Sequence, residues 1–169
     1  LDSKRQYSCA YFKSENDSLE QAQNNKIQHI IKKLNIQPNQ KVLDIGCGWG
    51  SLAIDIAKNA SCEVTGITLS ENQLNYCNQK AKEINLENQV KFKLMDYRQL
   101  KEKFDRIVSV GMFEHVGRKF YKKFFKQVER LKTDFLYTEG TYDKYVIRDP
   151  VKVQRVISLL WSIISSTDT

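Results

Sequence analysis

Hydrophobic positions along the chain follow two different spacings. Short apolar runs typical of buried strands occur at residues 41–45, 63–68, 90–94, 104–110 and 135–138. Amphipathic segments with helical spacing cover residues 19–35, 51–59, 71–84 and 119–132. Because strands and helices alternate, the pattern predicts an α/β fold, a doubly wound parallel sheet with helices on both faces.

Two predicted helices begin with a capping box, in which a Ser and a Gln three residues later satisfy amides of the first turn. The boxes are Ser18–Gln21 and Ser70–Gln73. In the first helix, the residues predicted to face the core are Leu19, Ala22, Ile27, Ile30, Ile31 and Leu34. Residues 141–150 look irregular and residues 151–165 can form an amphipathic helix. We therefore expect a domain at residues 1–140 and a C-terminal tail at residues 141–169.

Composition narrows the class of protein without deciding its function. The 169 residues and 41% hydrophobic content suit one globular domain, and no apolar run approaches the roughly 18 residues of a membrane span. Four cysteines without a CxxC pair and two histidines argue against a zinc site and for reduced thiols in the cytoplasm. The net charge of +7 favours anionic partners, an acidic lipid surface or a nucleic acid, although Lys-rich composition also occurs without such a role.

A glycine-rich loop, Gly46-Cys47-Gly48-Trp49-Gly50, follows the first predicted strand. Ligands of open parallel sheets bind beyond the carboxyl ends of the strands, where glycines allow close approach to the backbone. The positive end of the following helix suits a ligand carboxylate. Asp44, just before the loop, can meet a positively charged amino group, and its alternative role is a cap of the loop. The methionine end of S-adenosylmethionine carries both groups.

A dinucleotide cofactor is the alternative for such a loop, but two features disfavour it. Dinucleotide-binding folds use GxGxxG and an acidic residue at the end of the second strand. This chain has GxGxG, and its second strand ends in Gly66-Ile67-Thr68-Leu69-Ser70.

Five segments carry a more specific pattern. They are Tyr7–Phe12 (YSCAYF), Val42–Gly50 (VLDIGCGWG), Gly66–Gln73, Asp96–Arg98, and Phe104–Gly117, which ends in VGMFEHVG. Together they resemble the cyclopropane-fatty-acyl-phospholipid synthases and their relatives, the mycolic acid cyclopropane synthases, over about residues 6–132. The resemblance implies the class I S-adenosylmethionine-dependent methyltransferase fold, which is Rossmann-like. It also implies methyl transfer to the cis double bond of an unsaturated fatty acyl chain of a phospholipid, forming a cyclopropane ring.

The resemblance further implies which residues hold S-adenosylmethionine. Tyr7 and Ser8 would close over the cofactor, and Tyr97 with Arg98 would line the adenine pocket. The wall at the glycine loop would consist of Leu43, Asp44, Gly46, Cys47, Gly48, Trp49, Gly50 and Ser51. The ribose would be held by Thr68, Leu69, Ser70 and Gln73. Taken without the family, Leu43, Leu69 and Tyr97 could be core residues, and Arg98 a solvated surface charge.

For the chemical step, the resemblance implies Cys9 and Glu114 as catalytic residues that hold a bicarbonate ion, the acceptor of the proton lost by a carbocation. The aromatic candidates for stabilising that cation are Tyr7, Tyr11, Phe12 and Phe113. Outside the family context, Cys9 could be a small buried hydrophobe and Glu114 a helix-start carboxylate. His115 is expected to have a structural role. No metal site is expected.

The resemblance ends after Leu131. The His-Thr-Ile-Gly type motif of the family has no counterpart in Lys132–Gly140, a later family Tyr is absent, and five of seven expected strands are predicted. The chain also begins with Leu1 instead of Met, so we expect a part of a longer protein, incomplete at both ends. One hypothesis is an active lipid methyltransferase completed by a partner chain.

Two other hypotheses remain beside the active enzyme. One is an inactive remnant that at most binds the cofactor. The other is a methyltransferase acting on another substrate such as RNA. A nucleic-acid substrate is disfavoured because Gly111–Glu114 stands where a base-stacking (N/D)-P-P-(Y/F/W) motif would be expected.

The helix predicted at about residues 119–132 separates basic from aromatic residues. Its basic residues are Arg118, Lys119, Lys122, Lys123, Lys126 and Arg130, and its apolar side holds Phe120, Phe124, Phe125 and Val128. This face predicts peripheral contact with an anionic membrane, and an ordinary helix with one core face and one solvated face is the alternative. We expect a cytoplasmic protein with peripheral contact at the inner membrane surface. The sequence predicts neither acyl-chain preference nor oligomeric state.

Overall fold

The structure of the protein, a computed structural model, describes residues 1–139 and 144–147. Its centre is a sheet with strand order β3-β2-β1-β4-β5-β6. The strands are β1 (Lys41–Ile45), β2 (Glu63–Thr68), β3 (Val90–Leu94), β4 (Phe104–Val110), β5 (Lys132–Glu139) and β6 (Lys144–Ile147). The first five are parallel, and β6 pairs antiparallel with β5. From β1 to β3 each new strand is added on one side of β1, and β4 is then added on the other side. The strand order therefore reverses between β1 and β4.

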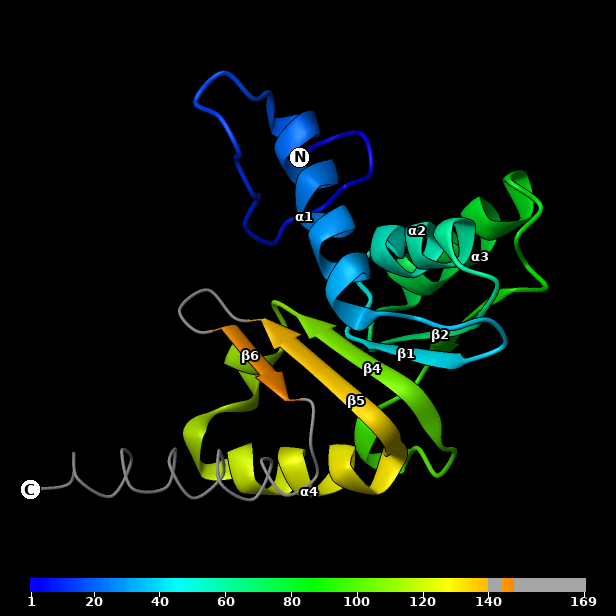
Figure 1. The fold of residues 1–169 in the computed structure, drawn as a ribbon. Coiled ribbons are helices and arrows are strands. Elements are labelled where there is room, and N and C mark those ends of the chain that lie inside the picture. The colour runs from blue at the N-terminus through cyan, green and yellow to red at the C-terminus, as the bar shows by residue number, and fades with distance from the viewer. Residues whose placement is uncertain (140–143, 148–169) are drawn as a thin grey trace, which may run out of the picture.

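Helices cover both faces of this sheet (Figure 1), as the sequence predicts. One face carries α1 (Leu19–Leu34), α2 (Ser51–Asn59) and α3 (Glu71–Glu83), and the other carries α4 (Tyr121–Leu131). Two hydrophobic cores result, because neighbouring strand residues point to opposite faces. Val42 packs in the core under α1–α3, whereas Leu43 packs with Phe124 in the core over α4. Within the described residues, no helix is long and apolar enough to span a bilayer.

The first capping box is present and the second is only half formed. Ser18 Oγ accepts from the Gln21 amide at 3.2 Å, and Gln21 Oε1 accepts from the Ser18 amide at 2.8 Å. Ser70 Oγ likewise accepts from the Gln73 amide at 3.4 Å, but the Gln73 side chain accepts from the Thr68 hydroxyl at 2.6 Å instead. The prediction of Leu19 as a core residue is wrong. Leu19 is 46% exposed, because the first turn of α1 projects beyond the sheet (Figure 1).

The prediction of an irregular segment at residues 141–150 is wrong for residues 144–147, which form β6. The sheet therefore has six strands among the described residues, not the five predicted. Tyr145, Val146 and Ile147 favour extended structure, and they pair along the open edge of β5. The helix predicted at residues 151–165 lies outside the described residues. The division into a domain at residues 1–140 and a tail at residues 141–169 stays a prediction.

A buried arginine of β4 fixes the C-terminal end of α1. Arg106 Nε donates to the Leu34 carbonyl at 2.8 Å, and Nη2 donates to the Asn35 carbonyl at 3.3 Å. Carbonyls at a helix C-terminus have no partner inside the helix, and a cation is favoured there. Arg106 thus holds α1 in one position against the sheet.

The N-terminal residues fold back against α1 and α2. We call residues 2–8 the N-terminal strap. Lys4 Nζ of the strap contacts Asp55 of α2 at 2.5 Å and Asn24 of α1 at 2.9 Å. These contacts bring Tyr7 and Ser8 to the carboxyl ends of the parallel strands.

Candidate functional site

The glycine loop takes a path that side chains would obstruct. Gly48 and Gly50 have φ angles of +56° and +80°, which L residues rarely adopt. A Cβ atom at Gly48 would approach Tyr7 Oη to 3.0 Å, and one at Gly50 would approach Cys77 Sγ to 2.8 Å. The loop is therefore pressed between the N-terminal strap and α3.

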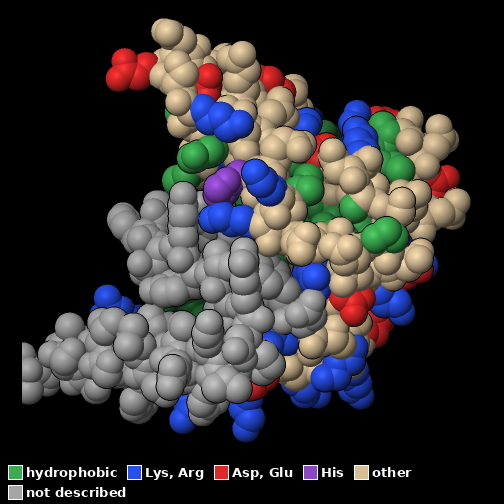
Figure 2. Space-filling view, viewed as in Figure 1, with side chains coloured by type: hydrophobic (Ala, Val, Ile, Leu, Met, Phe, Trp, Pro, Cys, Tyr) green, Lys and Arg blue, Asp and Glu red, His purple; other side chains and the backbone are tan. Residues whose placement is uncertain are grey.

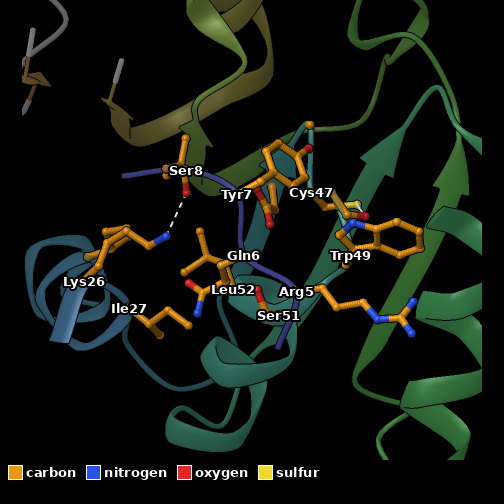
Figure 3. Close-up of a pocket in the computed structure, with 15 residues that line it drawn as sticks. Arg5, Gln6, Tyr7, Ser8, Lys26, Ile27, Cys47, Trp49, Ser51 and Leu52 are labelled. Carbon is orange, nitrogen blue, oxygen red and sulfur yellow. Dashed lines mark hydrogen bonds between the residues drawn. The ribbon is translucent and has the colours of Figure 1, made fainter. Parts of the chain in front are cut away.

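A small cavity of about 50 Å³ adjoins the loop (Figure 3). Its lining comes from the strap, α1, the glycine loop, the start of α2 and the C-terminal ends of β1 and β4. The lining residues are Arg5, Gln6, Tyr7, Ser8, Lys26, Ile27, Ile30, Asp44, Gly46, Cys47, Gly48, Trp49, Ser51, Leu52 and Val110. Asp44 is 2% exposed, and its Oδ2 has no hydrogen-bond partner among the described residues. Burial raises the pKa of Asp44 to about 7. A buried carboxyl without a partner indicates a place for a positively charged ligand group.

A larger cavity of about 470 Å³ lies on the other side of Tyr7. It shares Tyr7, Gly46, Gly48 and Val110 with the small cavity. Its other lining residues are Ile45, Ile67, Thr68, Leu69, Gln73, Met95, Asp96, Tyr97, Arg98, Gly111, Met112, His115, Val116, Phe120 and Lys123. The two cavities therefore form one site along the carboxyl ends of β1, β2, β3 and β4, where the sheet order reverses.

Two charged residues of the large cavity, Asp96 and Arg98, are paired with each other. Asp96 accepts from the amide and the Nε of Arg98, each at 2.9 Å. The Arg98 side chain holds the pKa of Asp96 below its usual range. Nearby, Gln127 Nε2 of α4 donates to the Tyr97 carbonyl at 3.0 Å, which ties this segment to α4. The wall formed by Asp96–Arg98 is thus built before any ligand arrives.

Most residues predicted to bind the cofactor line one or both cavities. The small cavity brings together Tyr7, Ser8, Asp44, Gly46, Cys47, Gly48, Trp49 and Ser51. The large cavity adds Thr68, Leu69, Gln73, Tyr97 and Arg98. Leu43, Gly50 and Ser70 line neither, because Leu43 packs in the core, and Gly50 and Ser70 are the N-caps of α2 and α3.

The two residues predicted to be catalytic lie elsewhere. Cys9 is exposed, contrary to the reading as a buried hydrophobe, and it lines neither cavity. Glu114 is also exposed and lies in the first turn of the 3-10 helix Phe113–Val116. Of the aromatic candidates, Tyr7 lines both cavities, whereas Phe113 is a core residue whose ring stacks on Tyr121 at 4.4 Å. The bicarbonate roles of Cys9 and Glu114 stay predictions.

Sequence reasoning missed Lys26, which lines the small cavity, and treated His115 as structural although it lines the large one. Lys26 Nζ donates to Ser8 Oγ at 2.7 Å, and Lys26 is 5% exposed (Figure 3). A signal was present, because Lys26 lies on the core-facing stripe of α1 beside Ile27. Lysine is rarely buried without a specific reason. Among the described residues, no three His, Cys, Asp or Glu side chains form a group suited to a metal ion.

Comparison with known proteins gives consistent matches. A sequence profile for mycolic acid cyclopropane synthetase matches residues 1–146. The cyclopropane-fatty-acyl-phospholipid synthase of Escherichia coli (strain K12) is 48% identical over 130 residues, which is 77% of this chain and 33% of that protein.

Two solved structures are also similar. The cyclopropane synthase MmaA2 from Mycobacterium tuberculosis has a TM-score of 0.79 and 35% identity over 83% of this chain and 50% of its own. The mycolic acid cyclopropane synthase CmaA1 complexed with SAH and CTAB has a TM-score of 0.76 and 37% identity over 82% of this chain and 48% of its own. The chain thus spans between a third and a half of the length of these proteins. These matches confirm the resemblance and the predicted fold class.

Proposed function

Since the chain belongs to the mycolic acid cyclopropane synthetase family, we propose that its two cavities bind S-adenosylmethionine. We further propose that they serve methyl transfer to the cis double bond of an unsaturated phospholipid acyl chain, forming a cyclopropane ring. The observation that carries the proposal is Asp44, whose buried Oδ2 has no described partner beside the glycine loop. The ammonium group of the cofactor is the complement of this carboxylate.

The residues present fit the parts of this cofactor. Its charged amino-acid end suits the small cavity, which contains Asp44 and the glycine loop. Its adenosine suits the large cavity, where Gln73 and the Tyr97 ring offer a polar and an aromatic surface. When bound, the sulfonium supplies an activated methyl group. Tyr7, which lies over Gly48 between the cavities, is placed to orient the ligand where its two halves join.

The large cavity also has the apolar walls that an acyl chain requires. Ile67, Met112 and Val116 line it together with the partly exposed ring of Phe120. An alkene is a weak nucleophile, so these side chains would contribute by excluding water and by holding the double bond in line with the methyl group.

A second candidate function is cofactor binding without ring formation by this chain alone. The observation that favours it is the exposure of Cys9 and Glu114 outside both cavities. Residues that hold a proton-accepting bicarbonate must lie next to the reacting atoms. The missing positions would come from the parts of the relatives that this chain does not span.

We also propose peripheral contact with an anionic membrane through the basic face of α4 and the turn before it. The six residues of this face, Arg118, Lys119, Lys122, Lys123, Lys126 and Arg130, are all exposed. Lys and Arg side chains gather along the lower rim of the molecule, where Figure 1 places α4 (Figure 2). Phe120, 56% exposed, lies beside this face and at the large cavity, which would let a lipid pass from a bilayer into the site.

Two measurements on the full chain test these proposals. Calorimetric titration with S-adenosylhomocysteine should give saturable binding, and its absence would contradict the proposed cofactor site. Labelled S-adenosylmethionine is then incubated with unsaturated phospholipid vesicles, and products are read by mass spectrometry. Cyclopropanated lipid that disappears in Glu114→Gln supports the enzyme and refutes the second candidate. Binding without any product supports the second candidate.

A further inference from the structure

One turn in the wall of the large cavity is capped by a side chain of α4. Residues Tyr97–Gln99 form a single turn of 3-10 helix after β3, and Tyr97 and Arg98 line the cavity. The carbonyls of Tyr97, Arg98 and Leu100 face one common donor. This donor is Nε2 of Gln127 on α4, at 3.0, 3.4 and 3.2 Å. Carbonyls at the end of a helix have no partner inside it, so Gln127 supplies the cap that the turn itself lacks.

The same face of α4 also holds the ring of Tyr97. The Phe124 ring lies edge-on to the Tyr97 ring, with the centroids 5.2 Å apart and an angle of 66° between the planes. Phe124 is fully buried in the core over α4, so its ring is held in place. Residues three positions apart lie on one side of a helix. Phe124 and Gln127 therefore fix the ring and the carbonyl of Tyr97 from one face of α4.

The other polar contacts of this turn do not replace Gln127. Asp96 accepts from the Arg98 amide at 2.9 Å and holds the start of the turn. Arg130 donates to the Leu100 carbonyl at 2.8 Å, one residue beyond the turn, and Leu100 is a core residue that lines neither cavity. Gln127 is the side chain that reaches the carbonyls of the cavity-lining residues, and its amide has two protons to share among them.

Resting on the proposed binding of the adenosine in the large cavity, we propose that Gln127 is a positioning residue for the cofactor. By capping the turn, it sets where the Tyr97 ring stands and thereby the affinity for the adenosine half. Gln127 itself lines neither cavity, so its effect reaches the ligand through the backbone of the turn. Helix α4 thus shapes the adenosine wall from outside the site.

An isosteric variant separates the hydrogen bonds of Gln127 from its packing. Gln127→Glu keeps the shape of the side chain, but at pH 8 its carboxylate has no proton to donate and faces three carbonyl oxygens. These oxygens disfavour the charged form and raise the pKa of the introduced carboxyl above the usual value of about 4.3. At pH 5 the protonated carboxyl can donate again. The hydrogen-bonding role therefore predicts a binding defect that acid reverses.

Calorimetric titration of the full chain with S-adenosylhomocysteine measures this defect at pH 8 and pH 5. Gln127→Glu should weaken binding about 10-fold or more at pH 8 and come within about threefold of the wild type at pH 5. Gln127→Leu should lose about 3- to 10-fold at both pH values, because it has no donor at either. Each affinity is compared with the wild type at the same pH, since Asp44 has a pKa of about 7. Affinity for 5′-methylthioadenosine, which lacks the amino-acid end, should fall by the same factors.

Gln79→Glu is the matched control, because Gln79 is an exposed glutamine of α3 whose side chain donates to Glu83 at 3.0 Å, and it lines neither cavity. The control introduces the same charge and should leave both affinities unchanged at both pH values. Thermal unfolding followed by circular dichroism shows whether each variant is folded, and Gln127→Met replaces Gln127→Leu if the latter is not.

Hydrogen–deuterium exchange without ligand tests the cap independently of the cofactor. A peptide spanning residues 96–101 should exchange faster in Gln127→Leu than in the wild type, because the turn loses its cap. Unchanged affinity and exchange in Gln127→Leu, or a defect in Gln127→Glu that is equal at pH 5 and pH 8, overturns the positioning role. A wild-type chain that binds neither ligand contradicts the proposed function, whereas faster exchange in Gln127→Leu would still support the cap.

Discussion

In the small cavity, the carboxylate of Asp44 is buried without a described partner, whereas in the large cavity Asp96 accepts hydrogen bonds from Arg98. The two carboxylates have opposite pKa shifts, since burial raises that of Asp44 and Arg98 lowers that of Asp96. This difference between Asp44 and Asp96 distinguishes two roles that a buried or partly buried carboxylate can have in the wall of a cavity. A charge that is paired within the protein shapes the cavity, and a charge that is left for a ligand selects what the cavity binds.

The largest expected effect comes from filling the boundary between the two cavities. Gly48→Val places a branched side chain at a φ of +56°, against the ring of Tyr7. We expect loss of detectable S-adenosylhomocysteine binding by calorimetry. Gly117→Val is the matched control, because Gly117 also has a positive φ but a Cβ atom there meets only Phe120, at 3.9 Å. Equal affinity of the wild type and Gly48→Val would contradict the placement of the ligand.

Stability measured against pH should distinguish an unpaired from a paired carboxylate. The folded-state pKa of Asp44 is raised to about 7, so the unfolded chain loses this proton first and stability falls as pH rises from about 4 to 7. Asp44→Asn should therefore raise the free energy of unfolding at pH 8 by up to about 4 kcal/mol and change it little at pH 4. Urea unfolding at both pH values measures the effect.

Asp105→Asn is the informative counterpart on the neighbouring strand. Asp105 accepts from the Lys41 amide at 2.8 Å and from the Thr133 hydroxyl at 2.9 Å, and the Lys41 hydrogen bond lowers its pKa. A lowered pKa gives stability that is present at neutral pH and lost as pH falls through the folded-state pKa. Asp105→Asn should thus destabilise the protein at pH 8, with the opposite sign to Asp44→Asn. The same sign for both variants would refute the contrast.

The large cavity should differ from the small one in its access to membranes. Replacing Lys119 and Lys126 by Gln should weaken sedimentation with anionic vesicles by about 10- to 30-fold, since each lysine near such a surface contributes about 1 kcal/mol. Replacing Lys80 and Lys82 of α3 by Gln removes the same charge from the other face of the sheet and should have little effect. Binding that ignores lipid charge and salt would count against the basic face.

The smallest effect is expected where a charge is already paired. Arg98→Met breaks an exposed pair with Asp96, and such pairs are worth about 1 kcal/mol or less. We expect a two- to fivefold loss of affinity, about equal for S-adenosylhomocysteine and 5′-methylthioadenosine. A loss of affinity for S-adenosylhomocysteine alone would place Arg98 beside the amino-acid end of the ligand. It would contradict the assignment of the amino-acid end to the small cavity and of the adenosine to the large cavity.

The elements of the fold could be predicted because their signals are local. The capping box at Ser18 and the short apolar run at residues 41–45 each lie within a few residues. Even β6 carried a signal in Tyr145–Ile147, which the expectation of an irregular tail overlooked. Asp44 and the glycine loop could be placed in the site for the same reason.

The remainder of the site depends on contacts between distant residues. Lys26 meets Ser8 across 18 residues, and only the folded strap brings them together. The pairing of Asp96 with Arg98 is local, yet its place in a cavity wall depends on Gln127 of α4. Cys9 and Glu114 are likewise exposed because of how the segment after the strap and the turn after β4 pack. The type of these two residues does not determine that packing.

The cap that Arg106 places on α1 has a consequence for the order of folding. Its hydrogen bonds reach Leu34 and Asn35, which precede it by 72 and 71 residues. Lys26 lies about 12 Å farther along the same helix, at a rise of 1.5 Å per residue, so its position depends on where Arg106 holds the helix end. Contacts between residues so distant in sequence form late, because a long loop must close first. The strap, α1 and the glycine loop leave the ribosome well before β4, and we expect the chain to become able to bind its ligand only after β4 has entered the sheet.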